Sequence, residues 1–197
     1  GFRHELVSTL ALFELLKRAA PEHEAVSGFR WPDEASLDGA DDASTHDAAS
    51  EALSSGDGAL GTLAEELKSL TASEFDRVAY LVCSHHGKIR CTWASSPFDQ
   101  RADEPTLFGV LDGDELPALE LAAGDGSYVE TPPLRLHLEP AEIGLGERYG
   151  RAWNDRVADL LAEMGPFTLA YLEALFRAAD WRASKRKTQE TRGENSR

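Results

Sequence analysis

Residues 71–87 read TASEFDRVAYLVCSHHG, and this stretch decides how the chain is expected to fold. Ser73 is a suitable N-cap, because a serine side chain accepts a hydrogen bond from an unpaired amide of the first helical turn. Apolar residues follow at helical spacing, namely Phe75, Val78, Ala79 and Val82. Gly87 suits a C-terminal stop. The pattern therefore predicts an amphipathic helix that ends at two adjacent histidines, His85 and His86.

The histidine pair continues the apolar face of this helix. His85 lies four residues after Leu81, and His86 lies four residues after Val82, so both are expected to point toward the interior. A buried imidazole needs a partner. A metal ion is one such partner, and a hydrogen bond within the core is the other. The sequence of this helix leaves both interpretations open.

Asp180 is a second polar residue on an apolar face. Leu172, Phe176 and Asp180 follow one another at a spacing of four residues. An unpaired carboxylate there would cost several kcal/mol, which either a metal ion or an arginine would offset. Arg177 and Arg182 are the nearest arginines in the sequence.

His4 lies in residues 2–19, a run of good helix formers with apolar residues on nearly every face. We expect this helix to be buried and to end near Lys17 and Arg18. A hydrogen-bonded core histidine is one interpretation of His4. The other is that His4, His85, His86 and Asp180 converge from three helices on a divalent metal such as Mn, Fe, Co, Ni or Zn.

The remaining candidates for chemistry are weaker. His46-Asp47 and His23 lie in an acidic segment of low complexity, and His137 alternates with leucines in an expected strand. Cys83 is expected to fill the core rather than act as a nucleophile, and its spacing from Cys91 is not that of a zinc site. No phosphate-binding glycine loop and no Gly-x-Ser-x-Gly motif occurs in the sequence.

Taken as a whole, the sequence predicts a mainly α-helical domain over residues 1–184 with two insertions. Residues 21–61 carry ten acidic side chains against one arginine and form an acidic, partly disordered insertion, with a short helix near 47–54. Residues 107–138 contain short apolar runs broken by Gly and Pro, which indicate a small β-hairpin insertion. Helical spacing returns over residues 148–164 and again from Pro166. The basic tail, residues 185–197, is expected to be disordered.

The amino-acid composition limits which class of protein the chain can belong to. The chain has 197 residues, of which 42% are hydrophobic and 28% charged, as in a soluble globular domain. No apolar run approaches the roughly 18 residues that a membrane span requires. Two cysteines in the whole chain indicate free thiols and a cytoplasmic location. The net charge of −15 argues against strong nucleic-acid binding, although most of it is concentrated in residues 21–61.

Three segments taken in order resemble a known family. GFRHELVS (1–8), YLVCSHHGKIR (80–90) and GPFTLAYLEALFRAADWRAS (165–184) resemble the latter part of the HD nuclease domain of the type I CRISPR helicase-nuclease. GVLDGDELP (109–117) and ADWRAS (179–184) are most similar to subtype I-G, formerly I-U, in which the HD domain follows the helicase. The resemblance implies an HD-like helical bundle.

The resemblance also implies a role for individual residues. It makes His4, His85, His86 and Asp180 metal ligands, with His85, His86 and Asp180 catalytic. It implies a divalent cofactor (Mn, Ni, Co, Fe or Mg) that activates water against single-stranded DNA. Lys88 and Arg90 are candidate phosphate contacts by position. The implied partners are the helicase domain of the same protein and the crRNA-guided surveillance complex.

In that family another histidine and a His-Asp dyad precede the Arg-His-Glu motif, and this chain begins after them. We therefore expect a fragment with about half of the metal ligands and with weak activity by itself. Two other functions stay open: an HD phosphohydrolase that acts on nucleotides, and a non-catalytic helical interaction module.

Overall fold

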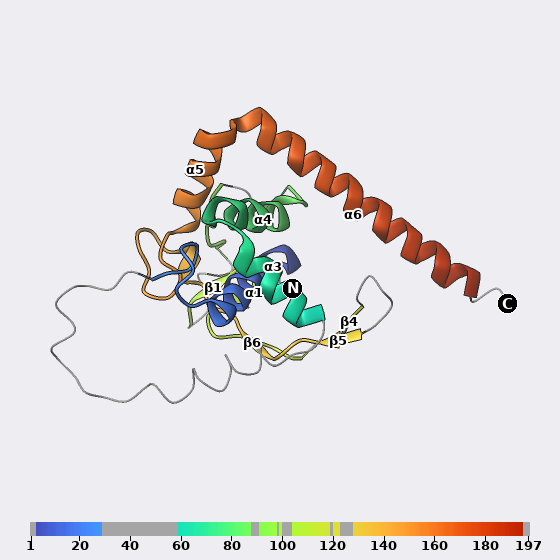
Figure 1. Cartoon of the computed structure of the whole chain (residues 1–197). Coiled ribbons are helices and arrows are strands. Elements are labelled where there is room, and N and C mark those ends of the chain that lie inside the picture. The colour runs from blue at the N-terminus through green and yellow to red at the C-terminus, as the bar shows by residue number, and fades with distance from the viewer. Residues whose placement is uncertain are drawn as a thin grey trace.

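The computed structural model describes residues 3–28, 59–87, 91–97, 99, 104–118, 120–122 and 128–194. Its order is α1 (His4–Ala19), α3 (Ala59–Ser69), α4 (Ala72–Ser84), six short strands, a 3-10 turn (Glu139–Ala141), α5 (Trp153–Met164) and α6 (Pro166–Glu194). The expectation of a mainly helical protein is confirmed, and the strands form small antiparallel pairs (Figure 1). The short helix expected near 47–54, and His46 with Asp47, lie outside the described residues.

The first helix forms the centre of the core. Four apolar side chains of α1 are almost completely buried: Leu6, Leu10, Phe13 and Leu16. They recur every three or four residues and therefore share one face. α1 contacts α3, α4 and β6 (Leu134–Arg135), so this face is covered by segments distant in the sequence. Lys17 and Arg18 occupy the last turn, as expected.

The start and the buried face of α4 both differ from the expectation. Thr71, not Ser73, is the N-cap, and it forms a capping box with Glu74. The Ser73 hydroxyl donates instead to Glu163 on α5, at 2.5 Å. The most buried apolar residues are Phe75, Ala79, Tyr80 and Cys83, whereas Val78 is exposed. The face is thus rotated relative to the predicted stripe.

The end of α4 agrees with the sequence. The helix ends at Ser84, His85 is the C-cap residue, and Gly87 has a φ of +70°. This left-handed conformation is one that glycine adopts without a steric penalty. The chain therefore turns immediately after the two histidines.

The β segment consists of two units. β1 (Thr106–Leu107) pairs with β2 (Val110–Leu111) in a small hairpin. β3 (Glu115–Leu116) then pairs with β6, and β4 (Glu120–Ala122) pairs with β5 (Tyr128–Glu130), all antiparallel. Glu115 lies opposite Arg135 and Glu120 opposite Glu130, so one register runs through both pairs.

Prolines explain why this long hairpin is divided. Pro117 lies between β3 and β4, and Pro132 and Pro133 lie between β5 and β6. Proline has no amide hydrogen to donate to a strand ladder. The hairpin insertion expected over 107–138 is therefore one interrupted arm preceded by a small hairpin.

The C-terminal helices form a sharp corner. α5 ends at Met164, Gly165 has a φ of +78°, and Pro166 begins α6, as the sequence predicts. The expected helix over 148–164 begins later, at Trp153. α6 runs to Glu194, so most of the tail expected to be disordered is helical. Figure 1 shows its C-terminal part extending away from the other helices.

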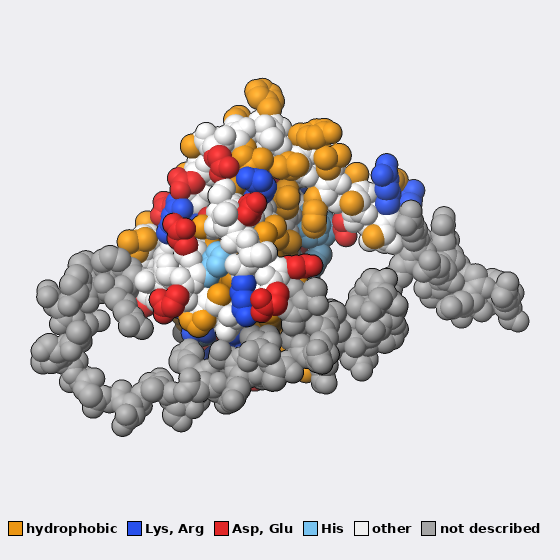
Figure 2. All heavy atoms as spheres, in the orientation of Figure 1, with side chains coloured by type: hydrophobic (Ala, Val, Ile, Leu, Met, Phe, Trp, Pro, Cys, Tyr) orange, Lys and Arg blue, Asp and Glu red, His pale blue; other side chains and the backbone are white. Residues whose placement is uncertain are grey.

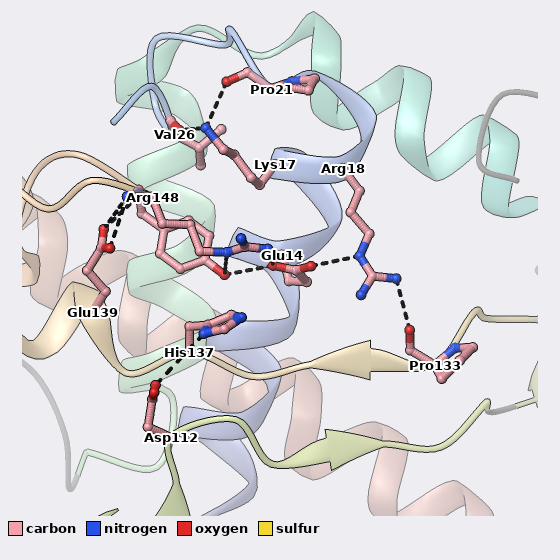
Figure 3. A network of polar contacts seen from close by, with 11 residues as sticks. Glu14, Lys17, Arg18, Pro21, Val26, Asp112, Pro133, His137, Glu139 and Arg148 are labelled. Carbon is pink, nitrogen blue, oxygen red and sulfur yellow. Dashed lines mark hydrogen bonds and ion pairs between the residues drawn. The ribbon is translucent and has the colours of Figure 1, made fainter. Parts of the chain in front are cut away.

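Buried charges join these elements. Arg156 of α5 donates to Asp76 of α4 at 2.6 Å, and its guanidinium lies 4.8 Å from the Phe13 ring centroid of α1. A second network surrounds Glu14 of α1, which accepts from Arg18, Arg148 and Tyr149 (Figure 3). Both carboxylates are paired, as buried charges must be.

Within the described residues, no helix has the length and apolar character that crossing a bilayer would require.

Candidate metal centre

Three histidines meet where α1 begins and α4 ends. The ring centroids lie 4.7 Å apart for His4 and His86, 4.1 Å for His85 and His86, and 5.8 Å for His4 and His85. One nitrogen from each ring can be chosen so that the three atoms lie within 4.8 Å of one another. We call His4, His85 and His86 the histidine cluster.

His85 is held in one tautomer. Its Nδ1 lies 2.7 Å from the carbonyl oxygen of Val82, one turn earlier in α4. Because a carbonyl only accepts, Nδ1 must carry the hydrogen, and in the neutral ring the lone pair is then on Nε2. The ring is 8% exposed and contacts Phe176 of α6 edge-on, with centroids 5.6 Å apart. Orientation by a backbone carbonyl is typical of histidines that bind metals.

His4 and His86 face each other through their Nε2 atoms, which lie 2.8 Å apart. Nitrogen ligands lie about 2.0–2.1 Å from a zinc-like ion, so two adjacent ligands of one ion are about 3 Å or slightly more apart. The separation fits either an N–H···N hydrogen bond or two ligands of one ion. It excludes two charged rings in this arrangement, because two N–H donors cannot bond to each other.

The electrostatics favour the neutral form of His86. Burial lowers the pKa of His86, and so do the nearby His85 and His4, while Glu5 and Asp180 act in the opposite direction. The net shift is downward from 6.5. A neutral imidazole is the form that binds a metal.

Glu5 lies beside this cluster, although nothing in its sequence pattern distinguishes it as a site residue. It is 3% exposed, and its Oε2 lies 3.5 Å from Nδ1 of His4. Burial acts to raise the pKa of Glu5, but a backbone hydrogen bond and the charges of His4, His86 and Arg3 lower it overall. A carboxylate beside the outer nitrogen of a histidine is a common companion of metal ligands. The only signal in the sequence was its place next to His4.

Asp180 approaches the cluster from α6 without joining it. Its charge acts on His86, but it is not among the three residues whose ligand atoms lie within 4.8 Å. The alternative partners do not hold it either, since within the described residues Asp180 forms no ion pair with Arg177 or Arg182. Arg177 instead donates from Nε to the carbonyl oxygen of His85, at 2.6 Å.

The expected burial was wrong for two of the three histidines. His4 is the first residue of α1 with a side chain 65% exposed, and His86 is also exposed, whereas His85 is buried. The physical reason is that both exposed rings lie at helix ends, where the packed face no longer covers them. Lys88 and Arg90 lie outside the described residues.

The other candidates have structural contacts. His23 uses Nε2 toward the Leu70 carbonyl and accepts at Nδ1 from the Ala25 amide. His137 is half-buried near Asp112, with Nδ1 3.9 Å from Oδ1. Cys83 is a free, buried thiol whose pKa is raised by burial to about 12, which makes it a poor nucleophile.

No protein-family model, no curated protein and no solved structure matches this chain. The geometry of the histidine cluster and the sequence around it are therefore the observations that bear on function.

Proposed function

We propose that the histidine cluster binds a divalent metal ion and that the chain is part of a metal-dependent nuclease that cleaves single-stranded DNA. The observation that carries this proposal is the convergence of three imidazoles from two helices within 4.8 Å. The Arg-His-Glu and His-His-Gly motifs around these histidines also resemble those of the HD nucleases of type I CRISPR systems.

The donor set fits a transition metal. His85 offers Nε2 because the Val82 carbonyl fixes its tautomer, and the Nε2 atoms of His4 and His86 lie 2.8 Å apart, close enough to bind one ion together. Imidazole ligands favour Mn, Fe, Co or Ni over Mg, which prefers oxygen. Glu5 and Asp180 add negative charge nearby, which would offset part of the charge of an ion.

The protein residues have separable roles in this proposal. A bound divalent ion would lower the pKa of water toward neutrality and polarise a phosphodiester oxygen. His85 would be the rigid ligand, because Val82 and Phe176 hold its ring. His4 and His86 would complete the nitrogen set, and Glu5 would orient His4. Asp180 would lie within reach of an ion, of water or of the leaving group.

Single-stranded DNA is proposed as the substrate because of the resemblance. In such an arrangement the helicase domain would deliver the strand, and the crRNA-guided surveillance complex would select it. A strongly acidic chain need not attract DNA strongly by itself under these conditions. Among the described residues three nitrogen ligands converge, so we expect one weakly bound ion and low activity.

The test combines calorimetric titration with Mn²⁺ or Ni²⁺ and a cleavage assay on single-stranded DNA, for the unaltered chain and for His85→Ala. We expect binding of one ion, with both binding and cleavage lost in the variant. Unchanged titration curves for His85→Ala would overturn the proposal. Cleavage of free nucleotides while single-stranded DNA is spared would identify a nucleotide phosphohydrolase instead.

A second candidate function is that of an interaction module. Five large apolar side chains are exposed on the described part of α6: Phe167, Tyr171, Leu175, Phe176 and Trp181. Figure 2 shows hydrophobic side chains along the upper edge of the molecule, over the first part of this helix. Exposed apolar areas of this kind often mark interfaces. This function is supported if metal titration gives no binding and His85→Ala changes no assay.

A further inference from the structure

Arg177 reaches from α6 over the end of α4, close to where the histidine cluster is attached. Its Nε donates to the carbonyl oxygen of His85 at 2.6 Å. A Cβ placed on Gly87 would overlap Nη2 of the same guanidinium. The guanidinium therefore lies against the backbone of the segment that carries both His85 and His86.

The bond to the His85 carbonyl uses only part of the hydrogen-bonding capacity of the Arg177 side chain. The last carbonyls of a helix have no partner within the helix and form its negative end, so an arginine there is stabilising. A guanidinium has five N–H donors, and this bond uses one. Among the described residues, Nη1 and Nη2 have no hydrogen-bond partner. Arg177 is therefore fixed at Nε, with its outer edge still able to donate.

Gly87 makes this close approach possible. Its φ of +70° is unfavourable for other residues, and its lack of a side chain leaves the space that Nη2 occupies. Any larger residue at this position would both strain the turn and displace the guanidinium.

The charges around the cluster explain why a free cationic group is needed there to bind a phosphate. Glu5 and Asp180 act electrostatically on His86, and both would repel a phosphodiester. Arg3 lies 3.6 Å from Glu5 and over the Phe108 ring, so its charge is balanced by that carboxylate. Arg177, by contrast, forms no ion pair with an acid among the described residues.

We infer that Arg177 is the residue that contacts the phosphate of single-stranded DNA bound at the histidine cluster. The inference rests on the proposed function and names a phosphate contact for it. Nε stays on the His85 carbonyl, while Nη1 and Nη2 donate to two oxygens of one phosphate, the fork geometry that arginine forms and lysine does not. Because Nε is already anchored, little side-chain entropy is lost when the phosphate binds.

The test measures Mn²⁺ affinity by calorimetry and, separately, the affinity for a fluorescein-labelled oligothymidylate by anisotropy with Mn²⁺ present. Arg177→Met keeps the length of the side chain and removes the donors. We expect its Mn²⁺ affinity to be unchanged and its DNA affinity to fall about tenfold or more. The slope of log affinity against log salt should decrease by about one phosphate contact.

Three further variants distinguish a direct phosphate contact by Arg177 from a purely structural role of this side chain. Gly87→Ala keeps the charge but displaces the guanidinium, and should weaken DNA binding in the same way. Arg177→Lys should recover only part of the affinity. Arg182 is an exposed arginine on the same helix, so Arg182→Met is the matched control. It should lower the DNA affinity less than Arg177→Met does.

The outcomes are distinguishable. Equal DNA affinity for Arg177→Met and the unaltered chain, with Mn²⁺ still bound, overturns this inference alone. So does a loss of Mn²⁺ affinity and thermal stability that accounts for the whole effect on DNA, because Arg177 would then only hold α6 against α4. Absence of DNA binding by the unaltered, Mn²⁺-loaded chain also overturns it. Absence of Mn²⁺ binding overturns the proposed function and this inference together.

Discussion

The Nε2 atoms of His4 and His86 lie 2.8 Å apart, although 82 residues separate them in the chain. The contact exists because α1 and α4 pack along their apolar faces, which brings the start of one helix beside the end of the other. Within this contact the two nitrogens form one hydrogen bond or share one ion. Replacing either histidine should lower the metal affinity in the second case only.

Replacing either exposed histidine should weaken metal binding strongly. For His4→Ala and His86→Ala we expect the Mn²⁺ affinity to fall by at least about tenfold, because each change removes one of the three imidazoles proposed to bind the ion. Thermal stability without metal should change little, since both side chains are exposed. Calorimetry checks the affinity, and His137→Asn serves as a control histidine outside the cluster. If both alanine variants bind Mn²⁺ as tightly as the unaltered chain, the 2.8 Å contact is only a hydrogen bond.

Glu5→Gln tests the carboxylate beside His4. The amide has the same shape as the carboxylate but no charge, so Nδ1 of His4 loses its anionic partner. We expect a loss of Mn²⁺ affinity of about tenfold, which is typical when the partner of a metal-binding histidine is altered. Glu142→Gln, at an exposed position, is the matched control. Equal Mn²⁺ affinities in the two variants would mean that Glu5 has no part in the site.

Local signals in the sequence predicted much of this fold. Pro166 and Gly87 mark the start of α6 and the end of α4 as expected, because proline and glycine restrict or free the backbone at the residue itself. The N-cap was misplaced because Thr71 and Ser73 are both good caps. The pairing of Thr71 with Glu74 decides between them. The helix beyond Ser184 was missed because basic composition indicated disorder, although Lys, Arg, Gln and Glu are good helix formers.

The site was predictable only in part. His85 and His86 are conspicuous as a pair at a helix end, whatever the rest of the chain does. Their approach to His4 depends on how α1 crosses α4, which no local pattern contains. Glu5 is one acid among the 35 acidic residues, and only its distance from His4 distinguishes it. The position of Asp180, near the cluster but outside it, likewise depends on how α6 packs on α4.

The Glu14 network should make stability depend on acid pH. Burial acts to raise the pKa of Glu14, but the bonds from Arg148, Tyr149 and Arg18 lower it below 4.5 overall. The unfolded chain therefore binds this proton more readily, so the contribution of Glu14 is present above about pH 4.5 and is lost as pH falls through the folded-state pKa.

Glu14→Gln should therefore lower the free energy of unfolding by about 1–3 kcal/mol at pH 7. The difference from the unaltered chain should shrink below about pH 4.5. Urea unfolding at a series of pH values measures both effects, with the exposed Glu65→Gln as control. A difference that stays constant down to pH 3 would show that the carboxylate charge is not what stabilises this network.

The buried pair of Asp76 and Arg156 should behave as a unit. Arg156→Met leaves Asp76 without a partner in the core and should cost about 3–5 kcal/mol. Adding Asp76→Asn removes the unpaired charge, so the double variant should be more stable than Arg156→Met alone. Urea unfolding of the two single variants and the double variant gives the coupling energy. Additive costs would mean that the 2.6 Å bond contributes little to stability.

The two thiols should differ in reactivity by their burial. Cys83 is fully buried between α1 and the Trp93 side chain, and burial raises its pKa to about 12, whereas Cys91 is exposed. At pH 8 a disulfide reagent should therefore modify one thiol rapidly and the second only after urea unfolds the chain, because the thiolate is the reacting form. Cys91→Ser should abolish the fast phase, and Cys83→Ser should abolish only the slow one. Rapid labelling of both thiols in the folded protein would mean that α4, which carries the histidine pair, opens readily at its C-terminal end.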